Sequence, residues 1–255
     1  MQLVFPPAKI NIGLHVTAKR PDGFHQIETL FYPVASLHDV LEVAPAGRFT
    51  IRLSGLPVAG APEDNLCVKA YRLLQADFDL PPVAVYLHKV IPPGAGLGGG
   101  SSDATAMLQA LNELFSLQLS AGQLHRYAVQ SGSDCAFFLH RQPMLATGRG
   151  DILTPLPALP LQPYRVVIET PPVFISTAEA YAGITPRQPA QSLASLLAQP
   201  VEQWKDIIVN DFEPSVFARY PELAQIKQRL YDAGAVYAAM SGSGSALFGL
   251  FRNQS

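Results

Sequence analysis

The chain has 255 residues, 48% of them hydrophobic, and its 18 Lys and Arg residues against 20 Asp and Glu residues give a formal net charge of −2. This balance argues against a nucleic-acid partner, because binding a phosphate backbone requires concentrated positive charge. The sequence has no run of about 18 apolar residues that would predict a membrane span, and it does not open on the basic and apolar segments of a secretory leader. We expect a cytoplasmic protein that is a monomer or a homodimer.

The first part of the chain mixes short apolar runs with amphipathic segments. Apolar or alternating runs bounded by Gly, Pro and Asp predict strands, and apolar residues spaced three and four apart predict helices. We expect strands at residues 10–16, 40–43, 49–53 and 83–87, and helices at residues 65–76, 103–117 and 120–130.

A proline-rich segment follows. Four prolines stand within residues 155–163, and proline both forbids a helix interior and interrupts a sheet ladder. We therefore predict a linker at residues 151–163. It would join a domain of residues 1–155 to a domain of residues 156–255.

The second part of the chain again mixes both kinds of element. Pro221 in a first turn and Gly234 after a last turn bracket one clear helix. The mixed, non-alternating order predicts an α+β fold and not a doubly wound sheet. The other expected elements are strands at residues 165–169, 235–240 and 246–251, and helices at residues 176–183, 192–199 and 201–209.

The most informative segment is residues 92–105, which places five glycines in the seven positions 94–100, directly before a predicted helix. Residues without Cβ let successive backbone N–H groups turn toward one anion. The helix start adds unpaired N–H groups and partial positive charge, and the hydroxyls of Ser101 and Ser102 add donors and can cap the helix. Loop flexibility or close packing is the alternative explanation for such glycines. The helix that follows them favours a phosphate site.

Three other phosphate loops fit this segment poorly. A P-loop needs a lysine after its glycines, and none occurs between Lys89 and Arg126. Gly94, Gly96 and Gly99 match a dinucleotide fingerprint, but two prolines separate them from the preceding apolar run and no acid follows at the end of a second strand. The His-Arg-Asp and Asp-Phe-Gly sequences of protein kinases are absent downstream.

Three segments together carry a resemblance. Residues 92–102 read Pro-x-Gly-x-Gly-Leu-Gly-Gly-Gly-Ser-Ser, residues 8–14 and 20–25 resemble a family opening, and residues 240–245 read Met-Ser-Gly-Ser-Gly-Ser. In their order along the chain, these segments resemble the motifs of the GHMP kinases. The resemblance implies an amino-terminal ATP-binding domain like the second domain of ribosomal protein S5, a ferredoxin-like carboxy-terminal domain, and an active cleft between them.

The implied activity is ATP-dependent phosphorylation of a small alcohol. The triple-Gly-Ser-Ser form is most similar to the branch that phosphorylates the 2-hydroxyl of a cytidine-diphosphate-linked methylerythritol, a step in isoprenoid precursor synthesis. A kinase of the homoserine or mevalonate type is the alternative in the same class. A nucleotide-binding module without catalysis is the alternative in a different class.

Two residues are expected to carry the catalysis. Asp134 lies between small residues and an apolar run, where a turn or cap is the alternative role, and the resemblance implies that it accepts the proton of the acceptor hydroxyl. Lys9 interrupts an apolar strand, and it either reaches solvent or pairs with an acid. The resemblance implies that Lys9 pairs with Asp134 and favours the forming alkoxide.

The resemblance also implies the nucleotide site. Asn65, Lys89 and the apolar Leu66 match positions that line the adenine pocket, although Asn65 alone reads as a helix cap and Lys89 as a surface lysine. The residues expected to hold the phosphates are Pro93, Gly94, Gly96, Leu97, Gly98, Gly99, Gly100, Ser101 and Ser102.

The acceptor site is expected to read a cytosine. Phe24 offers a stacking face and His25 offers ring nitrogens, although such a pair is usually packing. The resembling kinases generally have tyrosine at the position of Phe24, so a hydroxyl contact is lost here. Thr177 and Tyr181, four residues apart on a helix, would close over the substrate, with Tyr181 as the second face of a cytosine sandwich. Asn11 and Gly242 match further substrate positions, and Gly242 also suits a turn between strands.

Metal chemistry is weakly marked. Mg²⁺ is expected with ATP, but no cluster of carboxylates identifies its ligands, so we leave the metal residues unassigned. Cys67 and Cys135 lack the spacing of metal ligands, and we expect both to be reduced, buried thiols.

Overall fold

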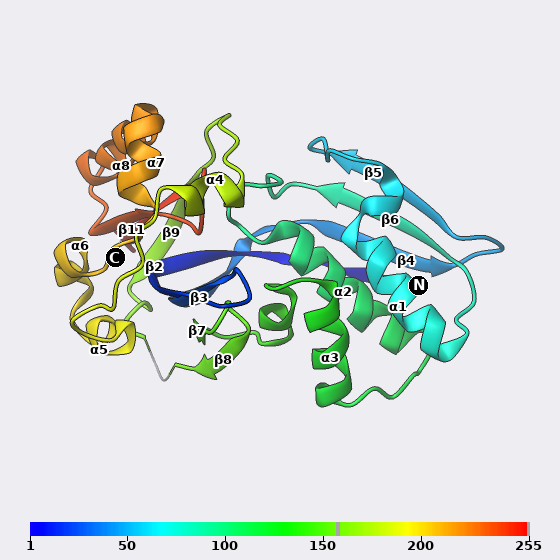
Figure 1. Ribbon diagram of the computed structural model, residues 1–255. Coiled ribbons are helices and arrows are strands. Elements are labelled where there is room, and N and C mark those ends of the chain that lie inside the picture. The colour runs from blue at the N-terminus through cyan, green and yellow to red at the C-terminus, as the bar shows by residue number, and fades with distance from the viewer. Residues whose placement is uncertain (157–158, 254–255) are drawn as a thin grey trace. The chain divides into compact units, whose positions relative to one another are not determined.

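The computed structural model describes residues 1–156 and 159–253 (Figure 1). The chain forms two compact units: unit 1 comprises Met1–Lys9, Pro33–Pro93 and Gly98–Arg141, and unit 2 comprises Ile10–Tyr32, Gly94–Leu97 and Gln142–Ser255. These units follow spatial contacts and are discontinuous in sequence, so the predicted domain division at residue 155 stays a prediction. Within the described ranges, no helix is long and apolar enough to cross a membrane.

Unit 1 contains a four-stranded sheet in the order β1-β4-β6-β5. Strand β6 pairs antiparallel with β4 and parallel with β5, and β1 pairs antiparallel with β4. Residues Val83, Val85 and Leu87 of β6 are buried and alternate with more exposed ones, so one face of this strand packs into the core. The strands are β1 (Gln2–Val4), β4 (Val40–Pro45), β5 (Thr50–Gly55) and β6 (Val83–Lys89).

Three helices of unit 1 pack against one another, and α2 also contacts β1 and β4 (Figure 1). Asn65 caps α1 by accepting from Cys67 N–H, and Ser120 forms a capping box with Gln123 at the start of α3. Met107 and Leu111 are completely buried on α2. The helical elements are η1 (Pro62–Asp64), α1 (Leu66–Phe78), α2 (Gly99–Leu114), α3 (Ala121–Ser131) and η2 (Cys135–Leu139).

Unit 2 holds most of a sheet in the order β2-β3-β7-β8 and all of a sheet in the order β10-β11-β9. The pairs β3–β7, β7–β8, β10–β11 and β11–β9 are antiparallel. The strands are β2 (Pro7–Lys19), β3 (His25–His38), β7 (Met144–Thr147), β8 (Ile152–Pro155), β9 (Tyr164–Glu169), β10 (Tyr237–Met240) and β11 (Leu247–Arg252).

Helix α8 packs against β10 and β11 and against α7 (Figure 1). Its buried residues Leu223, Ile226 and Leu230 join Met240 and Leu247 in one apolar cluster, which makes this face of α8 part of the core. The helices of unit 2 are α4 (Thr177–Ala182), α5 (Leu193–Leu197), η3 (Val201–Gln203), α6 (Trp204–Ile207), α7 (Glu213–Arg219) and α8 (Pro221–Asp232).

The α+β class is confirmed, and several elements differ from the predictions. Strands β1, β3 and β7 and helix α7 were not predicted. The expected linker is wrong at its start, because residues 152–155 form β8, an edge strand that pairs only with β7. Pro155 ends that strand, where a missing N–H costs little. Residues 157–158 of the expected linker lie outside the described residues.

The predicted helix at residues 201–209 is also wrong in part. Only η3 and the one-turn helix α6 form, and Ile208 is already extended. The start of α2 is a second correction. This helix begins at Gly99, after a left-handed Gly98 with φ of 71°, and no side chain caps it. Ser101 and Ser102 lie inside the first turn instead of capping it.

Candidate active site

The glycine loop, residues 92–98, leads into α2 through backbone that only glycine adopts easily. Gly96 and Gly98 have φ of 80° and 71°, in the left-handed region where a Cβ is unfavourable. A Cβ on Gly98 would also lie 2.9 Å from Phe138 and 3.1 Å from Cγ of Lys9. The loop therefore needs glycine here, and it leaves the first N–H groups of α2 without partners inside the helix.

Lys9 and Asp134 form an ion pair beside this helix start. Lys9 Nζ lies 3.5 Å from Asp134 Oδ2, and the lysine side chain is 4% exposed while the aspartate is 30% exposed. Burial lowers the pKa of Lys9 below its usual value, although Asp134 opposes this shift. The expected pairing is present, and the carboxylate stays partly open to solvent. Asp134 precedes η2 but makes no side-chain cap, so capping does not explain it.

A second lysine of unit 1, Lys89, is also buried. Lys89 Nζ donates to Asp39 Oδ2 and, at 2.6 Å, to Asp103 Oδ2. Asp39 Oδ1 also accepts from the N–H groups of Val90 and Ile91 at 2.6 and 2.9 Å. All three members of this buried triad (Lys89, Asp39 and Asp103) are less than 5% exposed. Lys89 is therefore not the surface lysine that its sequence alone suggested.

The buried triad carries two carboxylates and one ammonium. Burial would lower the pKa of Lys89, but the two acids outweigh it and raise that pKa. Burial raises the pKa of Asp103 to about 7; Lys89 opposes this shift and Asp39 adds to it. Since Asp103 belongs to α2 and Lys89 ends β6, the triad ties the amino-terminal part of α2 to the sheet.

The predicted nucleotide residues of unit 1 gather around the start of α2. A Cβ on Gly99 would lie 3.2 Å from Lys89 Nζ, and one on Gly100 would lie 3.5 Å from Leu66 Cδ1. Asn65, the neighbour of Leu66, has the capping role that its sequence alone suggested. The adenine roles of these residues stay predictions.

Ser101 and Ser102, in the first turn of α2, differ in their contacts. Ser101 Oγ interacts with the thiol of Cys135. Ser102 Oγ is buried and has no hydrogen-bond partner among the described residues, while its N–H donates to Gly98 O at 2.9 Å. The expected phosphate contacts of both hydroxyls stay predictions.

Three segments distant in sequence meet inside unit 2. Ser241 Oγ donates to Gly96 O at 2.9 Å and accepts from Asn11 N–H at 3.2 Å. A Cβ on Gly242 would lie 3.1 Å from Asn11 Oδ1. The amino-terminal strand, the glycine loop and the carboxy-terminal turn (residues 241–244) thus share one hydrogen-bond network. Asn11 Nδ2 also donates to Thr29 Oγ1, which in turn donates to Gly13 O.

The predicted aromatic residues include one stacked pair. The rings of His25 and Tyr181 stack on each other with centroids 4.5 Å apart, so His25 covers one face of the Tyr181 ring in this structure. The expected sandwich of a cytosine between Phe24 and Tyr181 stays a prediction. Phe212 packs edge-on against Tyr181 at 4.9 Å. Phe24 is 55% exposed, and the guanidinium of Arg149 lies 5.0 Å from its ring centroid. Thr177 is exposed in the first turn of α4, which carries Tyr181.

Metal and thiol chemistry are limited. Within residues 1–156 and 159–253, no three His, Cys, Asp or Glu side chains gather where they could hold a metal ion. Cys67 and Cys135 are both free and buried, as predicted. Burial raises the pKa of the Cys135 thiol to about 11 and also raises the pKa of the Cys67 thiol well above its usual value, so neither is a reactive thiolate.

Several residues of the site were missed in the sequence. Asp39 and Thr29 lie in stretches of sequence that contain no motif or spacing indicating a functional residue. Asp103 lies four residues before Met107, on the apolar stripe of its helix, and that position could have indicated a buried acid. Ser241 lies in the segment 240–245, where only Gly242 was expected to contact the substrate. Its function depends on a partner 145 positions away.

Comparison with known proteins agrees with this geometry. Residues 65–142 match the GHMP kinases N terminal domain, and residues 192–255 match the GHMP kinases C terminal domain. The chain is 52% identical, over 98% of its length and 92% of the relative's, to the 4-diphosphocytidyl-2-C-methyl-D-erythritol kinase of Bacteroides thetaiotaomicron. It is 48% identical to the enzyme of that name from Porphyromonas gingivalis, over 99% of this chain and 93% of the relative.

Solved structures give the same result. A crystal structure of 4-(cytidine 5'-diphospho)-2C-methyl-D-erythritol kinase superposes with a TM-score of 0.84 at 34% identity, covering 98% of this chain and 90% of the other. The mevalonate kinase of L. major shares the fold, with a TM-score of 0.69 at 17% identity over 100% of this chain and 88% of the other. The chain therefore belongs to the GHMP kinases and, within them, to the family of the 4-diphosphocytidyl-2-C-methyl-D-erythritol kinases.

Proposed function

We propose that this kinase transfers the γ-phosphoryl group of ATP to the 2-hydroxyl of 4-diphosphocytidyl-2-C-methyl-D-erythritol, giving the 2-phosphate and ADP in the methylerythritol phosphate route to isoprenoid precursors. Family membership supports the acceptor, and GHMP kinases use ATP as their phosphate donor. The observation that carries the proposal is the Lys9–Asp134 pair, whose lysine packs directly against Gly98 at the start of α2. A base, a cation and an anion-binding helix end are thereby neighbours within unit 1.

The glycine loop and the start of α2 bind the phosphates. Unpaired N–H groups of the first turn point along the helix axis, where the helix dipole also favours negative charge. Phosphoryl transfer needs little covalent help from protein, so holding and neutralising the phosphates supplies much of the catalysis. The buried triad contributes by fixing the first turn of α2 on the sheet.

Asp134 acts as the general base. It takes the proton of the acceptor hydroxyl while the hydroxyl oxygen forms a bond to the γ-phosphorus, and the bond from that phosphorus to the β,γ-bridging oxygen breaks to release ADP. Lys9, 3.5 Å from Asp134, favours the ionised carboxylate and stabilises negative charge on the attacking oxygen. The partial exposure of Asp134 leaves the acceptor a way to reach it.

The acceptor contacts come from unit 2. We assign them to Asn11 and Gly242 of the shared network, to the stacked pair of His25 and Tyr181, and to Phe24 and Thr177, which are exposed. An exposed phenylalanine provides a stacking face for a cytosine. In this assignment, the stacked rings of His25 and Tyr181 either separate when the cytosine binds or contact the cytosine with their edges.

Mg²⁺ is the expected companion of ATP, and it neutralises phosphate charge when bound. The described residues offer it no cluster of three ligands, so we assign it no protein ligand and no step above depends on it. We also expect the kinase to work in the cytoplasm on a small molecule, as a monomer or a homodimer, without nucleic acid.

A coupled assay of ADP release tests the proposal. The enzyme is offered 4-diphosphocytidyl-2-C-methyl-D-erythritol, homoserine and mevalonate separately, with ATP and Mg²⁺. We expect turnover of the first alcohol only, with competition by cytidine nucleotides. Turnover of homoserine or mevalonate instead would assign a different acceptor. ATP binding without ADP release for any alcohol would indicate a non-catalytic module.

A further inference from the structure

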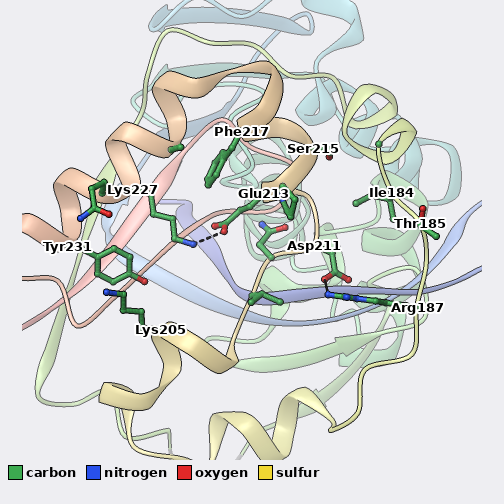
Figure 2. A pocket seen from close by; sticks show the side chains of 16 residues that line it. Ile184, Thr185, Arg187, Lys205, Asp211, Glu213, Ser215, Phe217, Lys227 and Tyr231 are labelled. Atoms are coloured by element: carbon green, nitrogen blue, oxygen red, sulfur yellow. Dashed lines mark hydrogen bonds and ion pairs between the residues drawn. The ribbon is translucent and has the colours of Figure 1, made fainter.

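A cavity of about 820 Å³ lies in unit 2, where α7 and α8 face residues 183–187 and 205–211 (Figure 2). This volume is typical of sites that bind small organic molecules. No residue predicted to bind ATP or the acceptor lines it, so the cavity is distinct from the proposed catalytic site. Its apolar walls are formed by Ile184, Val209, Pro214, Phe217 and Ala224.

The charged walls of the cavity are mainly cationic. Arg187, Lys205 and Lys227 line it against two acids, Asp211 and Glu213. Lys227 pairs with Glu213 at 2.6 Å, and Arg187 lies 4.0 Å from Asp211, as the dashed lines in Figure 2 show. Lys205 forms no ion pair within the described part of the chain. The charge of its ammonium is therefore available to an anionic ligand.

Lys205 and Lys227 are both neighbours of Tyr231, the first across space and the second along α8. The ammonium of Lys205 lies 4.6 Å from the ring centroid of Tyr231, and Lys227 precedes Tyr231 by four residues on α8, which places both on one helix face. Two ammonium groups beside an aromatic and aliphatic wall suit a molecule with a doubly charged head and an apolar body.

The floor of the cavity is hydrogen-bonded to the segment that enters the carboxy-terminal turn. Glu213 accepts from Met240 N–H at 2.8 Å through Oε1, while its Oε2 accepts from Lys227. Asn210 Nδ2 donates to Met240 O and Gly242 O, both at 2.8 Å. Asn210 and Glu213 are both buried. The carboxylate of Glu213 therefore links Lys227 to the backbone next to Ser241 and Gly242 by hydrogen bonds.

We infer that this cavity is a second ligand site, for a small organic phosphate monoester with an apolar body, and that its occupancy changes acceptor binding through Glu213 and the carboxy-terminal turn. The phosphate binds Lys205 and draws Lys227 away from Glu213, and the apolar body packs on Phe217 and the aliphatic walls. The effect on the acceptor rests on the proposed function, whereas the binding itself does not.

Calorimetric titration of the full chain with phenyl phosphate tests the binding. A non-hydrolysable ATP analogue is kept at saturation so that the probe cannot occupy the nucleotide site. We expect one saturable site, with inorganic phosphate and benzyl alcohol each bound roughly tenfold more weakly or worse, because each lacks half of the recognised chemistry. No saturable binding, or equal affinity for inorganic phosphate, would overturn the inference.

Substitution of the exposed Lys205 gives the matched test. Lys205→Met should weaken phenyl phosphate binding by about tenfold, the usual size for loss of a charge-assisted contact, while Lys19→Met on β2, outside the cavity, should leave it unchanged. Glu213→Gln should tighten binding, because it removes the carboxylate that competes for Lys227. An unchanged affinity in both cavity variants would place the probe elsewhere.

The kinetic arm measures the acceptor KM with and without phenyl phosphate. We expect a change of several-fold in the wild type and in Lys19→Met, and none in Lys205→Met. An unchanged KM despite saturable, Lys205-dependent binding would refute the coupling alone. If the enzyme turns over no acceptor, the proposed function fails, and the titration still decides whether the cavity binds a phosphate monoester.

Discussion

Unit 1 contains two lysine–carboxylate clusters beside the start of α2, and they differ in access to solvent. Lys9 pairs with Asp134 at 3.5 Å, and that acid is 30% exposed. Lys89 has two acid partners, and all three residues are enclosed. Burial prevails at Lys9 and lowers its pKa, whereas the two acids prevail at Lys89 and raise its pKa.

This difference separates a reactive ion pair from a structural one. An exposed carboxylate with a single, looser partner can accept a proton from an incoming hydroxyl. A carboxylate buried with a lysine and a second acid has no such access, and removal of any member leaves unpaired charge in the core. The same two residue types therefore suit the proposed chemistry in one cluster and the placement of α2 in the other.

The largest expected effect comes from Lys89→Met. It leaves Asp39 and Asp103 buried without a cation, so we expect the free energy of unfolding in urea to fall by about 3–5 kcal/mol. The matched variant Lys9→Met leaves only Asp134, which water reaches, and should cost under about 1 kcal/mol. An equal loss of unfolding free energy in Lys89→Met and Lys9→Met would contradict the distinction between a structural cluster at Lys89 and a solvent-accessible one at Lys9.

Asp134→Asn is expected to act on rate and not on stability. We expect kcat to fall by about 10²-fold or more, because general-base help is typically of that size, with the unfolding midpoint in urea nearly unchanged. Asp206→Asn, at an exposed acid of α6, is the matched control and should keep full activity. Near-normal turnover of folded Asp134→Asn would exclude Asp134 as the base.

The pH dependence of the free energy of unfolding tests the raised pKa of Asp103 in the buried triad. The folded pKa of Asp103, about 7, lies above its unfolded value of 3.8, so folding takes up a proton between these pH values. The stability that this carboxyl contributes to the folded protein is fully present below about pH 4 and is lost as the pH rises through 7. We therefore expect urea unfolding from pH 4 to 8 to show wild-type stability falling relative to Asp103→Asn. A constant difference between the two proteins would contradict the raised pKa.

The smallest expected effect is that of Ser241→Ala. The variant removes two hydrogen bonds, to Gly96 O and from Asn11 N–H, and such bonds contribute about 0.5–1.5 kcal/mol each. We expect the acceptor KM to rise by about 2- to 10-fold with kcat little changed. Ser195→Ala, which removes an exposed hydroxyl of α5, should leave KM as it is. An unchanged KM in Ser241→Ala would show that the hydrogen bonds of Ser241 to Gly96 and Asn11 do not contribute to acceptor binding.

Local signals explain which elements were predictable. The helical spacing of Met107, Leu108 and Leu111 predicted α2, and Pro221 together with Gly234 predicted where α8 begins and ends. Strand β3 was missed because buried and exposed residues do not alternate along it and Pro33 interrupts its sequence. β8 was missed because a strand at a sheet edge tolerates Pro155.

The sequence by itself determined the family, and it predicted a phosphate-binding role for residues 94–100 and the candidate pair of Lys9 and Asp134, because these depend on residue type and order along the chain. Only the tertiary structure decided that Lys89 is enclosed by two acids, that His25 lies on Tyr181, and that Ser241 joins two distant segments. Burial and hydrogen bonding between residues far apart in the chain depend on how the strands pair and the helices pack, and no local pattern encodes them.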